Sequence, residues 1–413
     1  MTLADLPAPG DRRVAVRATA DAIRQLRAGD PWLYDRSITS VSHEAPAGDL
    51  AVIFDDDRKF VAVGLWDPGS PIRVKVLQAG KPATIDAGWW KSAVTAAFER
   101  RASLAVDSST TAYRCVHGEN DGLAGLIVDR YEGTFVVKLY TRALLPHLPA
   151  LIDAVRAAGD AERIVLRLSR AVEAGDTYRL MDGTTVFGEP PTGPVLFRER
   201  GLLMEADVLH GQKTGHFLDQ RDNRALVRGL AEGADVLDVF ASTGGFAVAA
   251  AAGGATSVHL VALSAPAIAA AERNLAHNRN LRQVRACTVR SSVGDAFEVL
   301  AALGKRAERA ADRFDVVVLD PPSFAMNQAS ADRALRAYAR LTRLGVSLLR
   351  PGGTLVQASC SSRVTADQFF DTVFASAQSA GHPLHEIRRT GHPLDHPVGF
   401  ARGAYLKALF ATV

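Results

Sequence analysis

The chain has 413 residues and a mass of 44.0 kDa. At about 150 residues per domain this length predicts two or three domains, not one hydrophobic core. Hydrophobic residues make up 47% and charged residues 23% of the sequence, which are globular values and exclude a disordered chain. The net charge of +3 permits a nucleic-acid partner without requiring one.

The cysteines and the apolar segments indicate where the protein resides. Cys115, Cys287 and Cys360 show no Cys-x-x-Cys spacing and cannot all pair, so we expect no disulfide scaffold and no metal site. Residues 1–13 lack the apolar core of a signal peptide, and we expect a cytoplasmic protein. Residues 246–271 carry no charge, but Gly253-Gly254 and Pro266 interrupt them, so we expect no membrane span.

The first half of the chain predicts two small domains. Short β-rich runs at 50–54, 60–65 and 72–77, with a helix at 18–28 before them, are typical of a small barrel or sandwich. An amphipathic helix carrying Trp89 and Trp90 then leads into strands and a helix of α+β character, and we expect this Trp pair to lie in the core. The expected domains are 1–84, 85–190 and 191–413, the last boundary falling in the Pro- and Gly-rich segment 188–194.

The second half predicts an α/β domain with a mostly parallel sheet. Strands near 235, 258, 284, 315 and 354, and a last one at 405–411, alternate with helices. This alternation is typical of a doubly wound, Rossmann-like fold.

The chain is organised around Val236–Phe246, where an apolar strand passes through a small turn into an Ala-rich helix. Gly244 and Gly245 would let the backbone approach a ligand. Neither the dinucleotide pattern Gly-x-Gly-x-x-Gly nor a phosphate loop is present. Asp238 before the turn suits a ligand with positive charge, such as S-adenosylmethionine (SAM), although an ordinary βα turn without a ligand remains an alternative.

Two further strand ends carry chemistry. The strand 314–319 ends in Asp320, and the two prolines after it stiffen the loop, so that Asp320 and Phe324 would suit a flipped base. Cys360 follows the strand near 354, where a thiolate would be placed for nucleophilic attack; the alternative is a small buried hydrophobe. In the usual switched order the strands ending in Asp238, Asp320 and Cys360 are neighbours, about 4.8 Å apart.

Taken together, these motifs resemble the bacterial large-subunit ribosomal RNA cytosine-5 methyltransferases, which combine a PUA domain, a middle α/β domain and a Rossmann-like methyltransferase domain. The resemblance covers nearly the whole chain. The motifs that carry it, in chain order, are Pro31–Tyr34, Gly118–Leu126 with Asp129–Tyr131, Lys213–Gly215 with Leu218–Asp222, Thr243–Phe246, Asp320–Pro322, Ser359–Ser361 and Tyr405–Lys407.

The resemblance implies roles for residues. Cys360 would attack carbon 6 of a cytosine, and Asp320 would bind the cytosine edge. Contacts to SAM are expected from Gln220, Asp238, Phe240, Ala241, Thr243, Gly244, Gly245, Ala262, Asp295 and Asp320. Contacts to ribosomal RNA are expected from Arg36, Lys213, Arg221, Arg224, Pro321, Pro322, Phe324 and Arg402, and a homodimer is left open.

One departure from the family keeps alternatives open. The family usually ends its second strand with an acid that binds the ribose of SAM, but Ala262 stands there in this chain. Loss of a charge-assisted hydrogen bond costs about 1.5 to 3 kcal/mol. The alternatives are methylation of another base atom, such as an exocyclic amine or a purine N7, and a non-catalytic RNA-binding or ribosome-assembly protein that has lost SAM.

Overall fold

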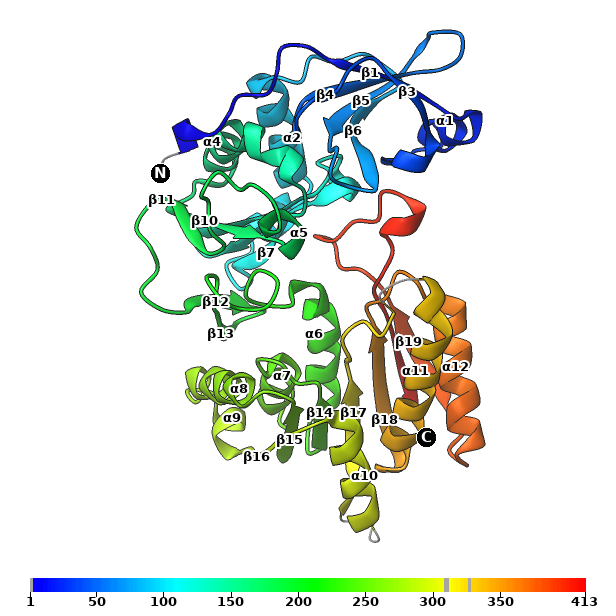
Figure 1. Ribbon diagram of the computed structural model, residues 1–413. Helices are drawn as coiled ribbons and strands as arrows, with labels where there is room; N and C mark the ends of the chain where they lie inside the picture. The colour runs from blue at the N-terminus through cyan, green and yellow to red at the C-terminus, as the bar shows by residue number, and fades with distance from the viewer. Residues whose placement is uncertain (1–2, 308–311, 326–327) are drawn as a thin grey trace. The chain divides into compact units, whose positions relative to one another are not determined.

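The computed structural model describes residues 3–307, 312–325 and 328–413. The chain forms two compact units. Unit 1 comprises Met1–Phe197, Ala206–Leu218 and Leu394–Gly403, and unit 2 comprises Arg198–Glu205, Asp219–Pro393 and Ala404–Val413 (Figure 1). Each unit is therefore assembled from segments that are far apart in the sequence.

The first sheet of unit 1 has six strands in the order β2-β6-β5-β4-β1-β3, of which only the pair β1 and β4 is parallel. Helix α1 (Ala20–Arg27), capped by the Thr19 side chain, packs on it through Ile23 and Leu26. The strands and helix expected here are confirmed. The strands are β1 (Val14–Ala18), β2 (Trp32–Tyr34), β3 (Ile38–Val41), β4 (Leu50–Phe54), β5 (Phe60–Trp66) and β6 (Ile72–Ala79).

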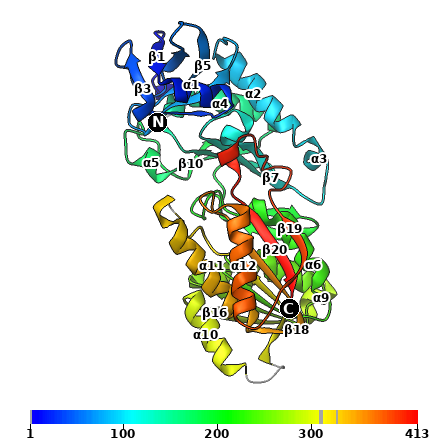
Figure 2. The same cartoon turned by 90° about the vertical axis from the view of Figure 1, so that its right-hand side faces the viewer.

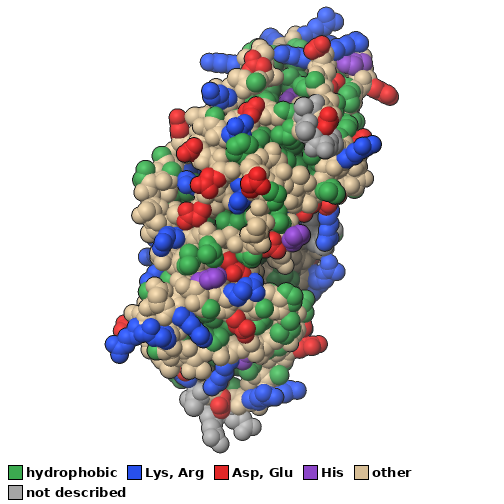
Figure 3. All heavy atoms as spheres, turned by 90° about the vertical axis from the view of Figure 1, so that its left-hand side faces the viewer, with side chains coloured by type: hydrophobic (Ala, Val, Ile, Leu, Met, Phe, Trp, Pro, Cys, Tyr) green, Lys and Arg blue, Asp and Glu red, His purple; other side chains and the backbone are tan. Residues whose placement is uncertain are grey.

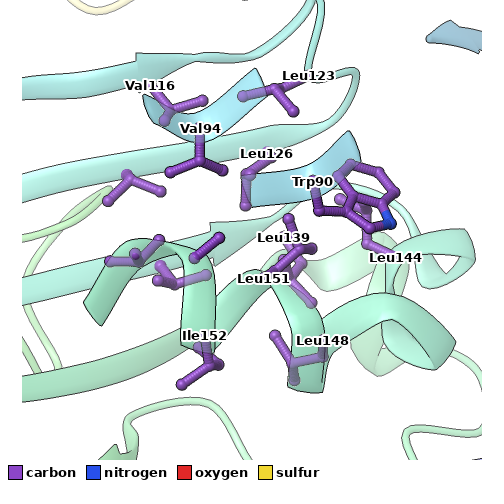
Figure 4. Packing of buried hydrophobic residues seen from close by; sticks show 14 of the residues in the cluster. Trp90, Val94, Val116, Leu123, Leu126, Leu139, Leu144, Leu148, Leu151 and Ile152 are labelled. Atoms are coloured by element: carbon purple, nitrogen blue, oxygen red, sulfur yellow. The ribbon is translucent and has the colours of Figure 1, made fainter. Parts of the chain in front are cut away.

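The second sheet of unit 1 has the order β11-β10-β9-β8-β7 and is covered by helices α2 (Ala87–Glu99) and α4 (Leu148–Gly159). Figure 4 shows Trp90 and Val94 of α2 and Leu148 and Leu151 of α4 in one cluster of buried hydrophobic residues. Trp90 is 1% exposed, which confirms its expected place in the core. The strands are β7 (Ala112–His117), β8 (Leu126–Tyr131), β9 (Thr134–Leu139), β10 (Arg163–Leu168) and β11 (Thr184–Phe187), and short helices are α3 (Ala102–Ala105) and α5 (Arg170–Glu173).

A hairpin of β12 (Val195–Glu199) and β13 (Leu202–Ala206) follows the Pro- and Gly-rich segment. The chain first leaves unit 1 inside this hairpin, after Phe197. The expected boundary at 190/191 lies a few residues earlier, whereas the one at 84/85 lies inside unit 1; the three-domain division stays a prediction.

Unit 2 contains a seven-stranded sheet with the order β16-β15-β14-β17-β18-β20-β19. Its first five strands are parallel, and β20 is antiparallel to both neighbours. The expected Rossmann-like class is thereby confirmed. The strands are β14 (Asp235–Val239), β15 (Ser257–Ala262), β16 (Thr288–Val293), β17 (Phe314–Leu319), β18 (Leu349–Ser359), β19 (His385–Thr390) and β20 (Lys407–Thr412).

Helices cover both faces of this sheet. Figures 1 and 2 show α11 and α12 side by side on one face, whereas α6, α7 and α8 lie on the other. The helices are α6 (Arg221–Leu230), α7 (Gly245–Ala252), α8 (Ala265–His277), α9 (Arg282–Ala286), α10 (Ala296–Arg306), α11 (Ala331–Val346) and α12 (Ala366–Ser379). The uncharged segment 246–271 forms α7, β15 and the start of α8, and in the described part of the chain no helix has the length and apolarity to cross a membrane.

The prediction of a strand near residue 284 is wrong. Residues 282–286 form α9, and the strand of this region, β16, starts at Thr288. β16 is an edge strand with mostly exposed side chains, as is β19, which the sequence did not predict. Edge strands lack the continuous apolar run that marks a buried parallel strand, so their sequence signal is weak.

Candidate active site

The chemistry-bearing strand ends meet at one edge of the unit 2 sheet. β17 pairs in parallel with β14 on one side and with β18 on the other, which confirms the expected neighbourhood. The backbone N–H of Asp320 donates to the Val239 carbonyl (3.4 Å), and the Cys360 thiol donates to the Pro321 carbonyl (3.8 Å). Asp320 and Cys360 thus belong to one group at the carboxyl end of the sheet.

The turn after β14 is held in an unusual backbone conformation. Phe240, Ser242 and Gly244 have φ of 64°, 48° and 77°. A Cβ on Gly244 would lie 2.6 Å from the Cβ of Ala271 on α8. Gly244 is therefore required by its φ and by helix packing, which is a different reason from the ligand approach that the sequence suggested. Ala241, Thr243 and Gly245 lie in the same turn and at the start of α7.

Asp238 presents the strongest feature for a cofactor. Its side chain is buried, its Oδ2 accepts the Ala247 N–H (3.0 Å), and its Oδ1 has no hydrogen-bond partner among the described residues. Burial raises the pKa of Asp238 to about 7, and the charge of Asp320 adds to that shift. A buried carboxylate oxygen without a donor fits the ammonium group of an amino acid moiety such as that of SAM.

Ala262 and Asp295 were also expected to contact the cofactor. Ala262 is the last residue of β15 and is buried, so the strand end offers no acid. Ser264 follows as the N-cap of α8, and its hydroxyl makes no capping hydrogen bond. Asp295 caps α10, where its Oδ1 accepts the N–H groups of Phe297 (2.9 Å) and Glu298 (3.2 Å). Whether these residues contact a cofactor stays a prediction.

A chain of hydrogen bonds orients Asp320. The Gln220 Nε2 donates to Asp320 Oδ1 (2.8 Å), the Asn223 Nδ2 donates to Gln220 Oε1 (2.5 Å), and the Thr390 hydroxyl donates to Asn223 Oδ1 (2.6 Å). Each amide is used at both ends, so its orientation is fixed. Gln220 was expected to contact the cofactor. In the structure its side-chain amide donates a hydrogen bond to Asp320, and a contact with the cofactor stays a prediction. Asn223 and Thr390 were not identified from the sequence.

The loop after Asp320 differs in part from expectation. Phe324 was expected to stack on a base, but its ring packs against Phe240, Phe297 and Tyr338 at centroid distances of 6.5, 6.2 and 5.1 Å. Phe324 is thus half-buried against this aromatic cluster, and its stacking on a base stays a prediction. In the same loop Pro321 is buried and Pro322 is exposed.

The arginines expected to contact RNA fall into two groups. Arg221 and Arg224 are 2% and 4% exposed, and Arg224 makes a two-pronged ion pair with Glu199 (2.6 Å). Buried side chains offer no surface to RNA, so the structure contradicts these two assignments. Arg36 and Lys213 are exposed on unit 1.

Arg402 is exposed too but is held in place. Its guanidinium lies 4.7 Å from the centroid of the Trp32 ring, donates to the Tyr34 hydroxyl (2.7 Å) and pairs with Asp30. The cation in this cluster is therefore fixed in orientation.

Sequence reasoning also missed a basic face on α11. Its members are Arg333, Arg336, Arg340 and Arg343, all exposed. The spacing of three, four and three residues puts them on one side of the helix, opposite the buried side, over about 15 Å. Within the described residues, none of these guanidinium groups has a carboxylate oxygen within 4.0 Å. In contrast, on the face that Figure 3 shows, basic and acidic side chains are interspersed.

Two family models match the chain. The model of S-adenosylmethionine-dependent methyltransferases matches residues 114–411, and that of PUA-like domains matches residues 16–79. The second match lies over the first sheet of unit 1, and the first includes all of the strand ends described above.

Curated relatives match over almost their whole length. The chain is 43% identical to a ribosomal RNA large subunit methyltransferase of Deinococcus radiodurans, covering 98% of both chains. It is 31% identical to ribosomal RNA large subunit methyltransferase I of Pseudoalteromonas translucida, covering 97% of this chain and 99% of that one.

Solved structures share the fold. A chain from Streptococcus mutans assigned as a SAM-dependent methyltransferase superposes with a TM-score of 0.81 at 20% identity, covering 97% of this chain and 100% of that chain. Another assigned methyltransferase, solved with S-adenosylhomocysteine (SAH), gives a TM-score of 0.82 at 22% identity over the same shares.

Proposed function

Because the chain belongs to the family of S-adenosylmethionine-dependent methyltransferases and carries a PUA-like domain, we propose that it methylates large-subunit ribosomal RNA at carbon 5 of a cytosine. The observation that supports this reaction best is the pairing of Cys360 with the Asp320 loop at the carboxyl end of the sheet. The relatives that act on ribosomal RNA support the substrate class.

Cys360 is the proposed nucleophile. Its thiolate adds to carbon 6 of the cytosine, which forms a C–S bond and moves electron density to carbon 5. When bound, SAM supplies the methyl group that carbon 5 takes. A base then removes the proton from carbon 5, and the C–S bond breaks to release the thiolate. Asp320, oriented by Gln220, would hold the cytosine edge and stabilise positive charge on its ring nitrogen.

The residues around Asp238 would hold the cofactor. The unpartnered Oδ1 of Asp238 would accept hydrogen bonds from the amino acid moiety, and the first N–H groups of α7 would face the same region.

Ser323 stands where two-cysteine RNA methyltransferases keep a second cysteine. Because serine has no thiol, product release would not use one there. The Ser323 hydroxyl donates to the Ala325 carbonyl (3.2 Å).

RNA contacts are proposed on both units. On unit 1 these are Arg36, Lys213 and Arg402, and on unit 2 Pro322 and the arginine face of α11. The guanidinium groups of the α11 face, which have no carboxylate partner among the described residues, are available to phosphates. We also propose the domain division 1–84, 85–190 and 191–413, and a cytoplasmic location.

The test combines product analysis with one variant. Purified protein is incubated with SAM and large-subunit ribosomal RNA, and the RNA nucleosides are analysed by mass spectrometry. We expect 5-methylcytidine with the wild-type chain and none with Cys360→Ala, while SAM binding measured by calorimetry is unchanged. A methylated purine or amine, or an undiminished rate in Cys360→Ala, would contradict the proposal. Cys287→Ala is the matched control and should methylate normally.

A further inference from the structure

Lys407 lies next to the proposed nucleophile. β20 pairs antiparallel with β18, and Lys407 is the partner of Ser359, the residue before Cys360. The Lys407 side chain is buried, and its Nζ donates to the carbonyls of Ser361 and Val364 (2.6 Å for Val364). Both carbonyls belong to the segment that directly follows Cys360, so Lys407 fixes the backbone on which the cysteine is presented.

The charge of Lys407 lacks the usual partner. A buried lysine is normally paired with a carboxylate, because an unpaired buried charge is costly. Lys75 in unit 1 follows this rule: it is 5% exposed, and its Nζ lies 2.9 Å from Asp67 Oδ2. Lys407 is 6% exposed, and among the described residues no carboxylate oxygen lies within 4.0 Å of its Nζ.

The ionisable group that does act on Lys407 is Cys360. Burial lowers the pKa of Lys407 to about 8, and the negative charge of the Cys360 thiolate opposes that shift. Two other groups face Cys360. Asp320 directly precedes Pro321, whose carbonyl accepts the Cys360 thiol (3.8 Å), and a charged carboxylate there would disfavour a thiolate. The Tyr338 hydroxyl bonds to the Ser359 hydroxyl (2.8 Å), and burial raises its pKa. Lys407 is thus a cation on the strand next to Cys360, close enough for the two charges to act on each other.

We propose that Lys407 is a positioning residue that provides the counter-charge of the Cys360 thiolate and holds residues 361–364 in place. This role rests on the proposed nucleophilic function of Cys360. A thiol with an ordinary pKa of about 8.5 is only a few per cent ionised at pH 7, and a neighbouring cation raises that fraction. The buried ammonium thereby makes the nucleophile available near neutral pH.

The test is the pH dependence of alkylation of the full-length protein by iodoacetamide, in which the thiolate displaces iodide and forms a C–S bond. The other cysteines provide little background below pH 9, because Cys115 is fully buried and burial raises the pKa of Cys287 to about 11. Cys360→Ser serves as the blank. We expect a wild-type midpoint below 8.5, an increase of about one pH unit or more in Lys407→Met, and a value near wild type in Lys407→Arg.

Several outcomes would overturn the proposal. A Lys407→Met variant with an unchanged midpoint and a lower plateau rate would show that Lys407 only supports the backbone. If Lys407→Met does not fold, a wild-type midpoint at or above 8.5 is sufficient to reject the counter-charge. Failure of the proposed function is distinguishable, because it appears as methyl transfer by Cys360→Ala and does not involve alkylation.

Discussion

The side-chain amide of Gln220 donates a hydrogen bond to Asp320 over 2.8 Å, and its own oxygen accepts one from Asn223. Asp320 is thus held as a hydrogen-bond acceptor through its Oδ1. The orientation of its carboxylate is thereby fixed before a substrate binds.

Replacing Gln220 by Leu removes this donor. Hydrogen bonds to charged groups contribute about 1.5 to 3 kcal/mol, so we expect kcat/KM for RNA to fall about 10- to 150-fold. Thr390→Val, at the far end of the same hydrogen-bond chain, should cost only a few-fold. The measurement is steady-state methylation of RNA together with a SAM titration. Equal losses in the two variants, or a parallel loss of SAM affinity in Gln220→Leu, would argue against an effect through Asp320.

Asp238 makes the stability of the ligand-free protein depend on pH. Its pKa is about 7 in the folded protein against an ordinary value of 3.8, so the folded state holds the proton more tightly than the unfolded state. The contribution of Asp238 to stability therefore falls as pH rises from about 4 to about 7, by roughly 4 kcal/mol, and is constant above that range.

Asp238→Asn should remove this dependence. We expect the variant to be more stable than wild type at pH 8 and similar to it at pH 4, measured as thermal unfolding without ligand. Asp295→Asn is the control, since Asp295 is exposed and Asn is an equally good N-cap. Parallel pH curves for wild type and Asp238→Asn would exclude an ionisable cost at this position.

A substitution at Ala262 tests whether affinity for SAM can be increased. Introducing an acid at the end of β15 with Ala262→Asp should restore a charge-assisted hydrogen bond to the ribose and tighten SAM binding about 10- to 150-fold. Leu263→Asp adds the same charge at the next position, which is 77% exposed, and should have little effect. Calorimetric titration with SAM and SAH distinguishes them. No gain in Ala262→Asp would mean that the ribose is bound by other groups.

The arginine face of α11 should contribute to RNA binding. Removing one cation that neutralises a phosphate lowers the slope of log K against log salt by about 0.7 to 0.9, so the double variant Arg336→Gln, Arg340→Gln should reduce it by about 1.4 to 1.8. Arg389→Gln is the control, because Arg389 already pairs with Glu386 (2.9 Å). Binding is measured on the same RNA between about 50 and 200 mM salt, concentrations over which the effect is large. An unchanged slope would mean that the arginines of α11 face solvent and do not contact the RNA.

The sequence predicted those parts of the protein whose signal is local. The buried strands β14, β17 and β18, and with them the grouping of Asp238, Asp320 and Cys360, follow from apolar runs that end in chemistry-bearing residues. The exposed edge strands β16 and β19 lack such runs, so one was misplaced and the other missed.

Side-chain partners could not be predicted in the same way. Arg224 has the sequence context of a surface helix, yet it is buried and paired with Glu199 of the preceding hairpin. Gln220 and Thr390 are 170 positions apart by their numbering and are joined through Asn223 only in the folded chain. A signal for Lys407 was present, since a lysine in an apolar strand is unusual, but only the register of β18 and β20 relates it to Cys360.

The segment Leu394–Gly403 affects how the protein is made. Asp395 and His396 are buried in unit 1, where Asp395 accepts hydrogen bonds from the Arg101 side chain and the Arg114 backbone N–H. β20 follows shortly after and is flanked by β18 and β19 in the sheet of unit 2. During synthesis, neither unit can therefore be completed until this late part of the chain has left the ribosome. A nascent chain that stops at Pro393 would lack the hydrogen bonds of Asp395 in unit 1, strand β20 in the sheet of unit 2, and Lys407 beside Cys360.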